Sequence, residues 1–279
     1  MKPIEHQPFT FSVIGTGRVG SCLLRSLPII GGTCTGIAST SAQEARLRFQ
    51  EYVVTGSISE LEFGDVCFLC IPDDHIEIMA QSIVDTGNNL NGRIFVHVSG
   101  AKNSSSLKMI EQKGGITGSF HPLASFKPDE NIQIFKNTWI SIEGNSNAVK
   151  ILTDIGHRLG ANPQQVDADF KIRLHLTAVI VSNFMSSLVL HASEVIKTDV
   201  EDPILFIRQN YASLMQSTLT NIISHGFPYA LTGPASRNDI NTMQIHKSML
   251  SSLNLENQLY QELSDTIRRF VEVETSKDQ

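Results

Sequence analysis

Short apolar runs alternate with helix-like stretches through the first 166 residues of the chain. The run 66–71 is apolar at every position, which is typical of a parallel strand covered on both faces. The pattern predicts strands at 9–14, 33–38, 53–54, 66–71, 93–98, 116–120, 139–142 and 164–166. Because helical stretches alternate with several of these strands, we expect right-handed crossovers and a doubly wound, mostly parallel sheet of the α/β class.

The pattern changes near Asp167, where strand signals end. From Asp169 to about Ile196 the chain has neither glycine nor proline, and this stretch predicts one long helix. The rest of the chain also has a helical pattern, with breaks at 226–228 and 232–239. We therefore expect a sheet domain over residues 1–166 and an all-helical domain over residues 167–279.

The long helix is apolar nearly all round. Between Leu174 and Ala192 it has no Asp, Glu, Lys or Arg, which raises the question of a membrane span. Its histidines, serines and Asn183 make it too polar for that. A helix of this kind needs cover on every side, so we expect a homodimer formed through the C-terminal helices.

A glycine-rich loop follows the first strand and leads into a predicted helix. Its residues are Gly15, Thr16, Gly17, Arg18, Val19 and Gly20. In this context the first glycine permits a tight turn, the second lets backbone N–H groups approach a diphosphate, and the third lets the helix pack close to the strand. The spacing predicts a dinucleotide site. A tight turn without a ligand is the alternative.

The second strand ends in Ser39, Thr40 and Ser41, where sites that prefer NAD carry an acidic residue. Hydroxyl groups there, with Arg18, Arg46 or Arg48 in reach, suit a 2′-phosphate, so we expect NADP rather than NAD. Ordinary surface turn residues and helix caps are the alternative interpretation. A methyltransferase would also use a glycine-rich loop, but it would need the acidic residue that is missing.

Further residues are predicted at the same edge of the sheet, because each follows a strand. We expect Ile71, Pro72, Asp73, Ser99 and Gly100 to line the cofactor cleft. Asp74 and Glu77 resemble a helix N-terminal capping arrangement.

Two histidines are candidate proton donors, because imidazole titrates near neutral pH. His121 follows the sixth strand, and His175 lies on the long helix. Asn183, eight residues further, is about 80° round an α-helix from His175, so both can face one cleft, with Asn183 orienting the substrate. Arg237 can hold a carboxylate or phosphate of an anionic substrate. For each histidine, a hydrogen-bonded structural role is the alternative.

Composition and charge limit the classes of molecule that the protein is expected to bind. The formal net charge of −6 over 279 residues argues against a nucleic-acid surface and favours small-molecule partners. The first six residues lack the apolar core of a secretory signal, and we expect a cytoplasmic protein with no membrane partner. All four cysteines lie in the first quarter of the chain, and Cys67 and Cys70 are interpreted as strand residues, so we expect no metal site.

Several motifs together carry a resemblance that spans nearly the whole chain. They are the glycine loop, Ile71-Pro72-Asp73-Asp74, Val98-Ser99-Gly100-Ala101, Ser119-Phe120-His121-Pro122-Leu123, Leu176 to Asn183, and Ala230 to Asp239. The chain resembles a family of bacterial Rossmann-like proteins with a helical C-terminal domain of unknown function. That family is similar to pyrroline-5-carboxylate reductases, deazaflavin-dependent NADP reductases, and the 6-phosphogluconate and hydroxyacid dehydrogenases.

The resemblance implies NADP binding by residues 1–166, a helical substrate and dimerisation domain over residues 167–279, and an active site between them. Hydroxyacid dehydrogenases carry a catalytic lysine four residues before an asparagine, whereas the polar positions here are Lys171, His175 and Asn183. That lysine mechanism is therefore not carried over. The close family usually has glycine where this chain has Asn238, which can still adopt a left-handed backbone.

We expect an NADP-dependent oxidoreductase that transfers a hydride between the nicotinamide and a small carbonyl or imine substrate. The alternative is a non-catalytic NADP-binding sensor or scaffold.

Overall fold

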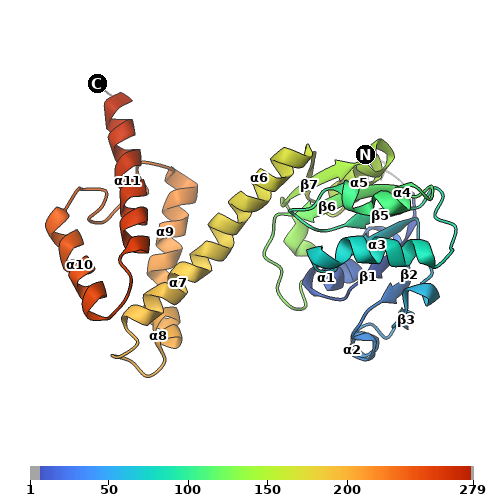
Figure 1. The fold of residues 1–279 in the computed structure, drawn as a ribbon, viewed down its shortest axis with the longest axis horizontal. Helices are drawn as coiled ribbons and strands as arrows, with labels where there is room; N and C mark the ends of the chain where they lie inside the picture. Colours follow the sequence, from blue (N-terminus) through green and yellow to red (C-terminus); the bar gives the residue numbers. More distant parts are fainter. Residues whose placement is uncertain (1–6, 278–279) are drawn as a thin grey trace, which may run out of the picture. The chain divides into compact units, whose positions relative to one another are not determined.

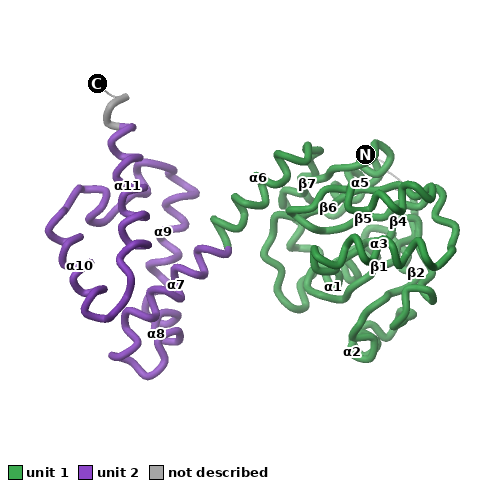
Figure 2. Tube along the Cα trace, viewed as in Figure 1, with its two compact units in different colours: residues 1–182 green, residues 183–279 purple. Residues whose placement is uncertain are grey.

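The computed structural model describes residues 7–277. Residues 1–6, on which the expected lack of a secretory signal rests, lie outside the described part. The chain divides into two compact units, Met1–Ser182 and Asn183–Gln279 (Figure 2). Within the sequence, this division falls inside the long helical stretch that begins near Asp167.

The first unit is built around an eight-stranded sheet (Figure 1). Its strands are β1 (Phe9–Ile14), β2 (Gly32–Ala38), β3 (Val54–Thr55), β4 (Val66–Leu69), β5 (Ile94–His97), β6 (Ile116–Pro122), β7 (Trp139–Gly144) and β8 (Asn162–Gln165). Its helices are α1 (Arg18–Ser26), α2 (Ala42–Arg48), α3 (Ile76–Asp85), α4 (Lys108–Glu111), α5 (Ser146–Arg158) and α6 (Ala168–Ala178). Short 3₁₀ turns lie at Pro28–Ile30, Ile58–Glu60, Asp73–His75, Ser104–Leu107 and Ile132–Phe135.

The strand order is β3-β2-β1-β4-β5-β6-β7-β8, which confirms the predicted doubly wound, mostly parallel sheet. The order reverses between β1 and β4, so the carboxyl ends of these strands form the crevice where open α/β sheets bind ligands. Only the β6–β7 pair is antiparallel among the paired strands. The connection between β6 and β7 has a 3₁₀ turn and no crossover helix, which an antiparallel neighbour does not need.

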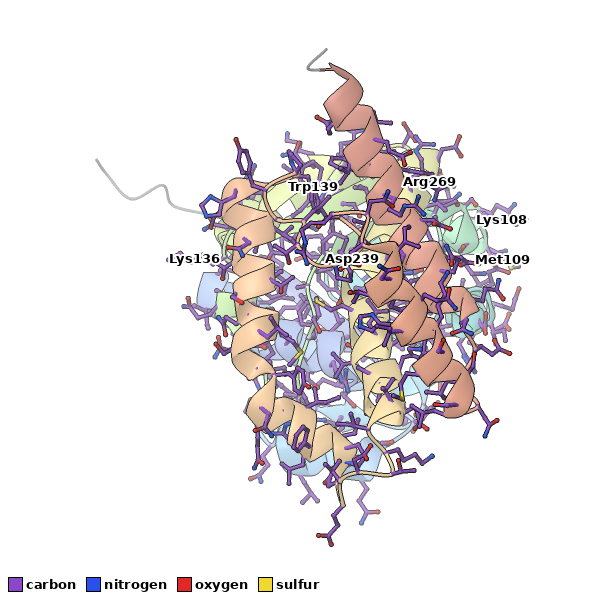
Figure 3. The ribbon with its side chains drawn as sticks, turned by 90° about the vertical axis from the view of Figure 1, so that its left-hand side faces the viewer. Lys108, Met109, Lys136, Trp139, Asp239 and Arg269 are labelled. Atoms are coloured by element: carbon purple, nitrogen blue, oxygen red, sulfur yellow. The ribbon has the colours of Figure 1, made fainter. Side chains whose placement is uncertain are left out.

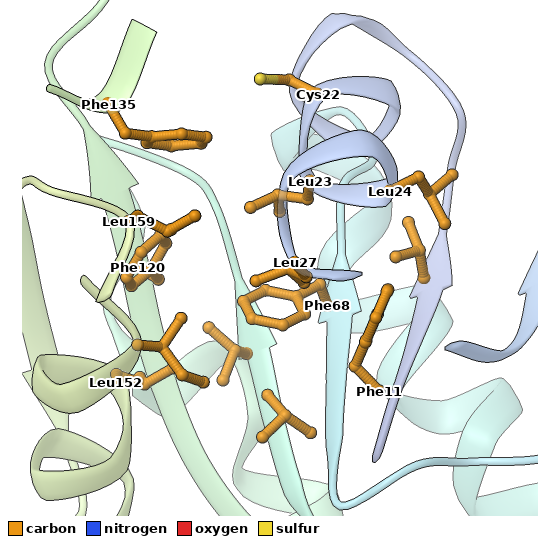
Figure 4. Packing of buried hydrophobic residues seen from close by; sticks show 14 of the residues in the cluster. Phe11, Cys22, Leu23, Leu24, Leu27, Phe68, Phe120, Phe135, Leu152 and Leu159 are labelled. Carbon is orange, nitrogen blue, oxygen red and sulfur yellow. The ribbon is translucent and has the colours of Figure 1, made fainter. Parts of the chain in front are cut away.

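Each face of the sheet has its own apolar core, because successive side chains of a strand point to opposite faces. Val66 and Phe68 of β4 join the core beneath α1 and α5, whereas Cys67 and Leu69 join the core beneath α3 and α4. Figure 4 shows part of the first core, with labelled residues from the strands, α1, α5 and the turn before β7. This two-sided burial explains why the run 66–71 is apolar throughout.

The C-x-x-C segment is part of this packing. Cys67 belongs to the α3 side and Cys70 packs against the α1 side, as the interpretation as a strand requires. All four cysteines are free thiols, and burial raises the pKa of both Cys67 and Cys70. Among the described residues, no group of three or more His, Cys, Asp or Glu side chains could hold a metal ion.

The second unit is helical. It contains α7 (Phe184–Val195), α8 (Pro203–Asn210), α9 (Ala212–His225), α10 (Ile240–Ser252) and α11 (Gln258–Lys277). The predicted breaks fall between α9 and α10, and Asp239, labelled in Figure 3, caps α10 by accepting a hydrogen bond from the Thr242 amide at 3.0 Å. Asn238 has a left-handed backbone with φ of 53°, as the resemblance requires at that position.

The long helix differs from the prediction in one respect. A π-helical segment, Val179–Asn183, separates α6 from α7. Within the part of the chain that the structure describes, Ala168–Val195 is the stretch whose length and apolar composition would allow a membrane crossing, and 6% of its apolar window is buried.

The capping interpretation of Asp74 and Glu77 is wrong. No side chain caps the start of α3 or of the 3₁₀ turn before it. Instead Glu77 accepts a hydrogen bond from the Lys102 ammonium at 2.8 Å and thereby ties α3 to the loop after β5. The ammonium of Lys102, which lies 25 residues further along the same chain, thus binds the carboxylate that the local pattern assigned to the helix N-terminus.

Candidate functional site

The glycine loop connects β1 to α1, and its three glycines differ in their surroundings. Gly15 has φ of 97°, and a Cβ on it would clash with the Cys70 carbonyl oxygen. A Cβ on Gly20 would clash with the Gly15 carbonyl oxygen. Gly17 has nothing within 4 Å of its Cβ position, and with φ of −64° it forms the N-cap of α1. The outer glycines are therefore required for packing, and Gly17 leaves open space.

The residues present fit a bound diphosphate. The first N–H groups of a helix have no partner within the helix, and the helix dipole favours negative charge there. The first turn of α1 carries no acidic residue, Arg18 is exposed, and Gly17 leaves room for close approach. Val19 packs instead against the core. Gly17, Arg18 and the backbone up to Gly20 would hold the diphosphate.

The end of β2 lies beside this loop. The hydroxyl oxygens of Ser39 and Thr16 are 2.9 Å apart, and the Ser41 amide donates to Ser39 Oγ at 3.2 Å. Ser39 is buried, whereas Thr40 and Ser41 are exposed. These hydroxyl groups stand where a nucleotide ribose would lie in a doubly wound sheet.

The side chains of Arg18, Arg46 and Arg48 differ in their hydrogen bonds. Arg46 Nε donates to the Val54 carbonyl at 3.1 Å. Arg48 donates to Ser21 Oγ at 3.0 Å and to the Thr16 carbonyl at 3.4 Å, so it supports the glycine loop. The Arg18 side chain is exposed on the first turn of α1. Of the three, Arg18 suits a 2′-phosphate best.

Further along the same edge, hydrogen bonds fix the loop after β5. Ser99 Oγ donates to Asp73 Oδ2 at 2.7 Å and accepts from the Ala101 and Lys102 amides at 3.2 and 2.9 Å. Asp73 follows Pro72, and Ile71 packs against the core on the α3 side. Asp73 and Ser99 thus fix the loop that contains Gly100.

His121 and His175 lie together. Their rings meet edge to face with centroids 5.4 Å apart, although one comes from β6 and the other from α6. A Cβ on Gly100 would lie 2.7 Å from His121 Nε2 and would also clash with His175 Nδ1. Glycine at position 100 therefore lets both rings approach the loop after β5.

The surroundings determine the protonation of His121. Its Nδ1 is 3.0 Å from the Val98 carbonyl oxygen, and burial lowers the pKa of His121 to about 4. Burial likewise lowers the pKa of His97, which is fully buried at the end of β5, to about 4. His97 Nε2 is 3.0 Å from the Asn103 carbonyl oxygen, while His97 Nδ1 and His175 Nδ1 are buried without a hydrogen-bond partner.

Lys171 also belongs to the site, although it was not predicted from the sequence as a site residue. Its side chain is 1% exposed, and Nζ donates to the Lys102 carbonyl oxygen. Burial lowers the pKa of Lys171 to about 8, and the carboxylates of Glu143 and Asp73 act in the opposite direction. The i, i+4 spacing from His175 could have identified it, because residues four apart on a helix share one face.

Glu143 supports this cluster from β7. Its two carboxylate oxygens accept hydrogen bonds from the amide and hydroxyl of Ser104, at 2.7 and 2.6 Å. Glu143 thus holds the 3₁₀ turn that follows the Gly100 loop. Its negative charge also raises the pKa of Lys171, against the larger effect of burial.

Asn183 and Arg237 belong to the second unit. Asn183 ends the π-helical segment and is exposed, so the angle of about 80° from His175, which assumes an unbroken α-helix, does not apply. Arg237 is exposed in the loop before α10, close enough to Asp239 to help lower the pKa of that carboxyl, after the larger effect of its hydrogen bonds with Thr242.

The fold and the glycine loop define the first unit as a Rossmann-type domain. The Rossmann-like domain family matches residues 3–122, and the family described as a domain of unknown function, DUF2520, matches residues 138–267. The chain therefore joins a Rossmann-like domain to a DUF2520 domain, which confirms the resemblance drawn from its motifs.

Solved structures share this architecture over nearly the whole chain. Protein TM1727 from Thermotoga maritima has 25% sequence identity and a TM-score of 0.73, with 95% of this chain and 99% of that chain covered. BF3122 from Bacteroides fragilis, named as a candidate NADP oxidoreductase, has 23% identity and a TM-score of 0.79, covering 94% and 98%. A reductive aminase from Aspergillus terreus in complex with NADPH and ethyl levulinate has 13% identity and a TM-score of 0.65, covering 95% and 94%. The chain has no significant match among curated proteins.

Proposed function

We propose that the protein is an NADP-dependent oxidoreductase that moves a hydride between the nicotinamide and a small carbonyl or imine compound. One observation carries the proposal. The glycine loop after β1 and a cluster of buried and half-buried ionisable side chains at the ends of β5 and β6, joined by α6, lie at the same edge of one sheet. Buried groups with shifted pKa values at a ligand-binding edge are typical of catalytic sites.

The nicotinamide, when bound, supplies the hydride. The chain itself has to hold the dinucleotide, position the substrate and manage one proton. Gly17, Arg18 and the start of α1 would hold the diphosphate, and Thr40, Ser41 and Arg18 would hold the 2′-phosphate. NADP is therefore preferred over NAD in this proposal.

The cluster provides groups for the substrate. Lys171 is a cation whose pKa of about 8 lies close to physiological pH, which suits a group that exchanges a proton. His121 and His175 offer ring nitrogens beside Gly100. The roles predicted for Asn183 and Arg237, in substrate orientation and anion binding, stay predictions, because both residues belong to the second unit.

The names of the structural neighbours agree with this reaction. BF3122 is named as a candidate NADP oxidoreductase, and the Aspergillus terreus enzyme is a reductive aminase crystallised with NADPH. An imine reductase from Myxococcus stipitatus, crystallised with NADP+, also shares the fold at a TM-score of 0.62. These names support the class of reaction, and the residues at the sheet edge support the site.

A titration with NADPH and NADH, followed by nicotinamide fluorescence, tests the proposal. We expect NADPH to bind more tightly than NADH, and Arg18→Ala to remove most of this difference. Gly17→Asp should weaken NADPH binding about tenfold or more, because two like charges near 4 Å repel by about 1 to 4 kcal/mol.

Gly17→Asn is the matched control, since it has the same size without the charge. Both side chains are good N-caps and Gly17 is open, so both variants should fold. Binding of neither nucleotide would contradict the proposal. Binding of NADPH without oxidation by any carbonyl or imine compound would favour the non-catalytic sensor.

A further inference from the structure

The peptide group between Thr16 and Gly17 is held in one orientation by side chains of α1 and α2. Ser21 Oγ, on α1, donates a hydrogen bond to the Thr16 carbonyl oxygen at 2.8 Å. Arg48, the last residue of α2, donates to the same oxygen at 3.4 Å and to Ser21 Oγ at 3.0 Å. Two donors therefore converge on one carbonyl oxygen of the glycine loop.

The side chain of Thr16 gives the loop a second anchor. Its hydroxyl oxygen is 2.9 Å from Ser39 Oγ, which directly follows β2. Ser21 and Ser39 are both buried. Rotation of the Thr16 carbonyl would leave the Ser21 hydroxyl without its acceptor, and an unpaired buried polar group is costly. The orientation of this peptide group is therefore fixed by the folded chain itself.

This orientation determines where the Gly17 N–H points. A trans peptide group is planar, with its C=O and N–H on opposite sides. Since the Thr16 oxygen faces Ser21 and Arg48, the Gly17 N–H points away from both. Gly17 is exposed and forms the N-cap of α1, so this N–H belongs to the helix start, which favours an anion. A rotated peptide would instead turn the partly negative Thr16 oxygen toward a diphosphate.

We propose that Arg48 and Ser21 are positioning residues of the dinucleotide site, which hold the Thr16 carbonyl so that the Gly17 N–H donates to the diphosphate. This inference rests on the proposed binding of NADP and adds two residues that act through the glycine loop. It gives Arg48 a different part from that of Arg18, which is proposed to bind the 2′-phosphate directly.

Arg25 is a neighbour of Arg48 that separates the effect of charge from that of hydrogen bonding. The guanidinium carbons of both arginines lie 5.4 Å from the centroid of the Phe49 ring. Arg25 donates to Asp129 at 2.7 Å, whereas the hydrogen bonds of Arg48 go to the glycine loop and α1. Replacing Arg25 thus removes an equal charge nearby and leaves the bonds to the loop in place.

Titration of the full chain with NADPH and with NADH, followed by nicotinamide fluorescence, tests the inference. Arg48→Met should weaken binding of both nucleotides by the same factor, about tenfold, because both carry the diphosphate and a hydrogen bond to a charged group is impaired. Ser21→Ala should weaken both in the same way. Arg25→Met should leave both affinities within about twofold of the native values, because solvent and salt screen a partly exposed charge.

The Gly17 amide itself reports the orientation of the peptide. Protein labelled with ¹⁵N only at glycine gives an amide signal for this residue, identified by its loss in Gly17→Ala. Saturation with NADP+ should move this amide proton downfield in the native protein and in Arg25→Met, and by much less in Arg48→Met. A general loss of stability does not produce this pattern, because the signal comes from folded protein with its site filled.

The outcomes separate this inference from the proposed function. Weaker binding of NADPH alone in Arg48→Met would mean that Arg48 binds the 2′-phosphate directly, and would overturn the inference. Equal losses in Arg25→Met and Arg48→Met would also overturn it, because charge alone would then explain them. Either result leaves the oxidoreductase proposal standing. A native protein that binds neither nucleotide overturns both.

Discussion

The histidines at the ends of β5 and β6, one buried and one half-buried, stay neutral because of their surroundings. His97 and His121 each give one N–H to a backbone carbonyl, and burial lowers the pKa of each to about 4. The unfolded chain keeps ordinary histidine values near 6.5, so between about pH 6.5 and 4 it binds more protons than the folded chain. Stability therefore falls as the pH is lowered through this window.

His97→Gln should reduce this acid sensitivity. The shift of His97 alone corresponds to about 3 kcal/mol lost between pH 6.5 and 4. Urea unfolding at several pH values, followed by fluorescence of Trp139, measures it, because this residue is the single tryptophan and lies on β7 of the first unit (Figure 3). His157→Gln is the exposed control. An unchanged pH slope in His97→Gln would contradict the burial argument.

At the scale of elements, a capping residue fixes where helix α6 begins, and this start positions two side chains of the site. Asp167 caps this helix, since its Oδ1 accepts from the Phe170 amide at 2.7 Å. The first turns of α6 carry Lys171 and His175, whose approach to the Gly100 loop depends on where the helix begins. The cap therefore helps to set the position of both side chains.

Asp167→Ala should lower the free energy of unfolding of the first unit by about 1 kcal/mol, because it leaves the first amides of α6 without an acceptor. Asp167→Asn should change it by only a few tenths of a kcal/mol, since asparagine caps equally well. Urea unfolding monitored by Trp139 again gives the values. Similar losses in both variants would show that the carboxylate acts through its charge instead.

The individual strands and helices were predicted from the sequence more completely than the way in which they join and pair. The strand at Val66–Leu69 follows from an unbroken apolar run, and the helix beginning at Ile240 from its Asp239 cap. The π-helical segment Val179–Asn183 has no such signal, because the residues that form it are ordinary helix residues. The antiparallel direction of β7 likewise follows from the path of its connection and from no pattern within the strand.

At the scale of the whole molecule, the second unit leaves much apolar surface uncovered. A groove of 590 Å³ between α7, α8 and α9 is lined almost entirely by apolar side chains. Leu214, which lines it, is 60% exposed, and Leu190 on α7 is 57% exposed. Apolar patches of this kind mark interaction sites. We propose that a second copy of the chain covers this surface.

Leu214→Glu should convert the proposed dimer to a monomer without unfolding it, because an exposed side chain contributes little to packing within one chain. Analytical ultracentrifugation over a range of concentrations measures the mass. Ile29→Glu, at a position that is 65% exposed in the first unit, is the matched control and should remain dimeric. A native protein that sediments as a monomer at all concentrations would refute the proposed dimer.

The sequence by itself determined the succession of strands and helices along the chain, the glycine loop and the residues that follow each strand. These features are local, because apolar periodicity, caps and glycine turns act over a few neighbouring residues. Only the tertiary structure decided that His121 and His175 meet at Gly100, and that Lys171 and His97 bind carbonyl groups in the loop that follows it. Such approaches depend on strand order, register and the entry of α6, which are set by packing between distant segments.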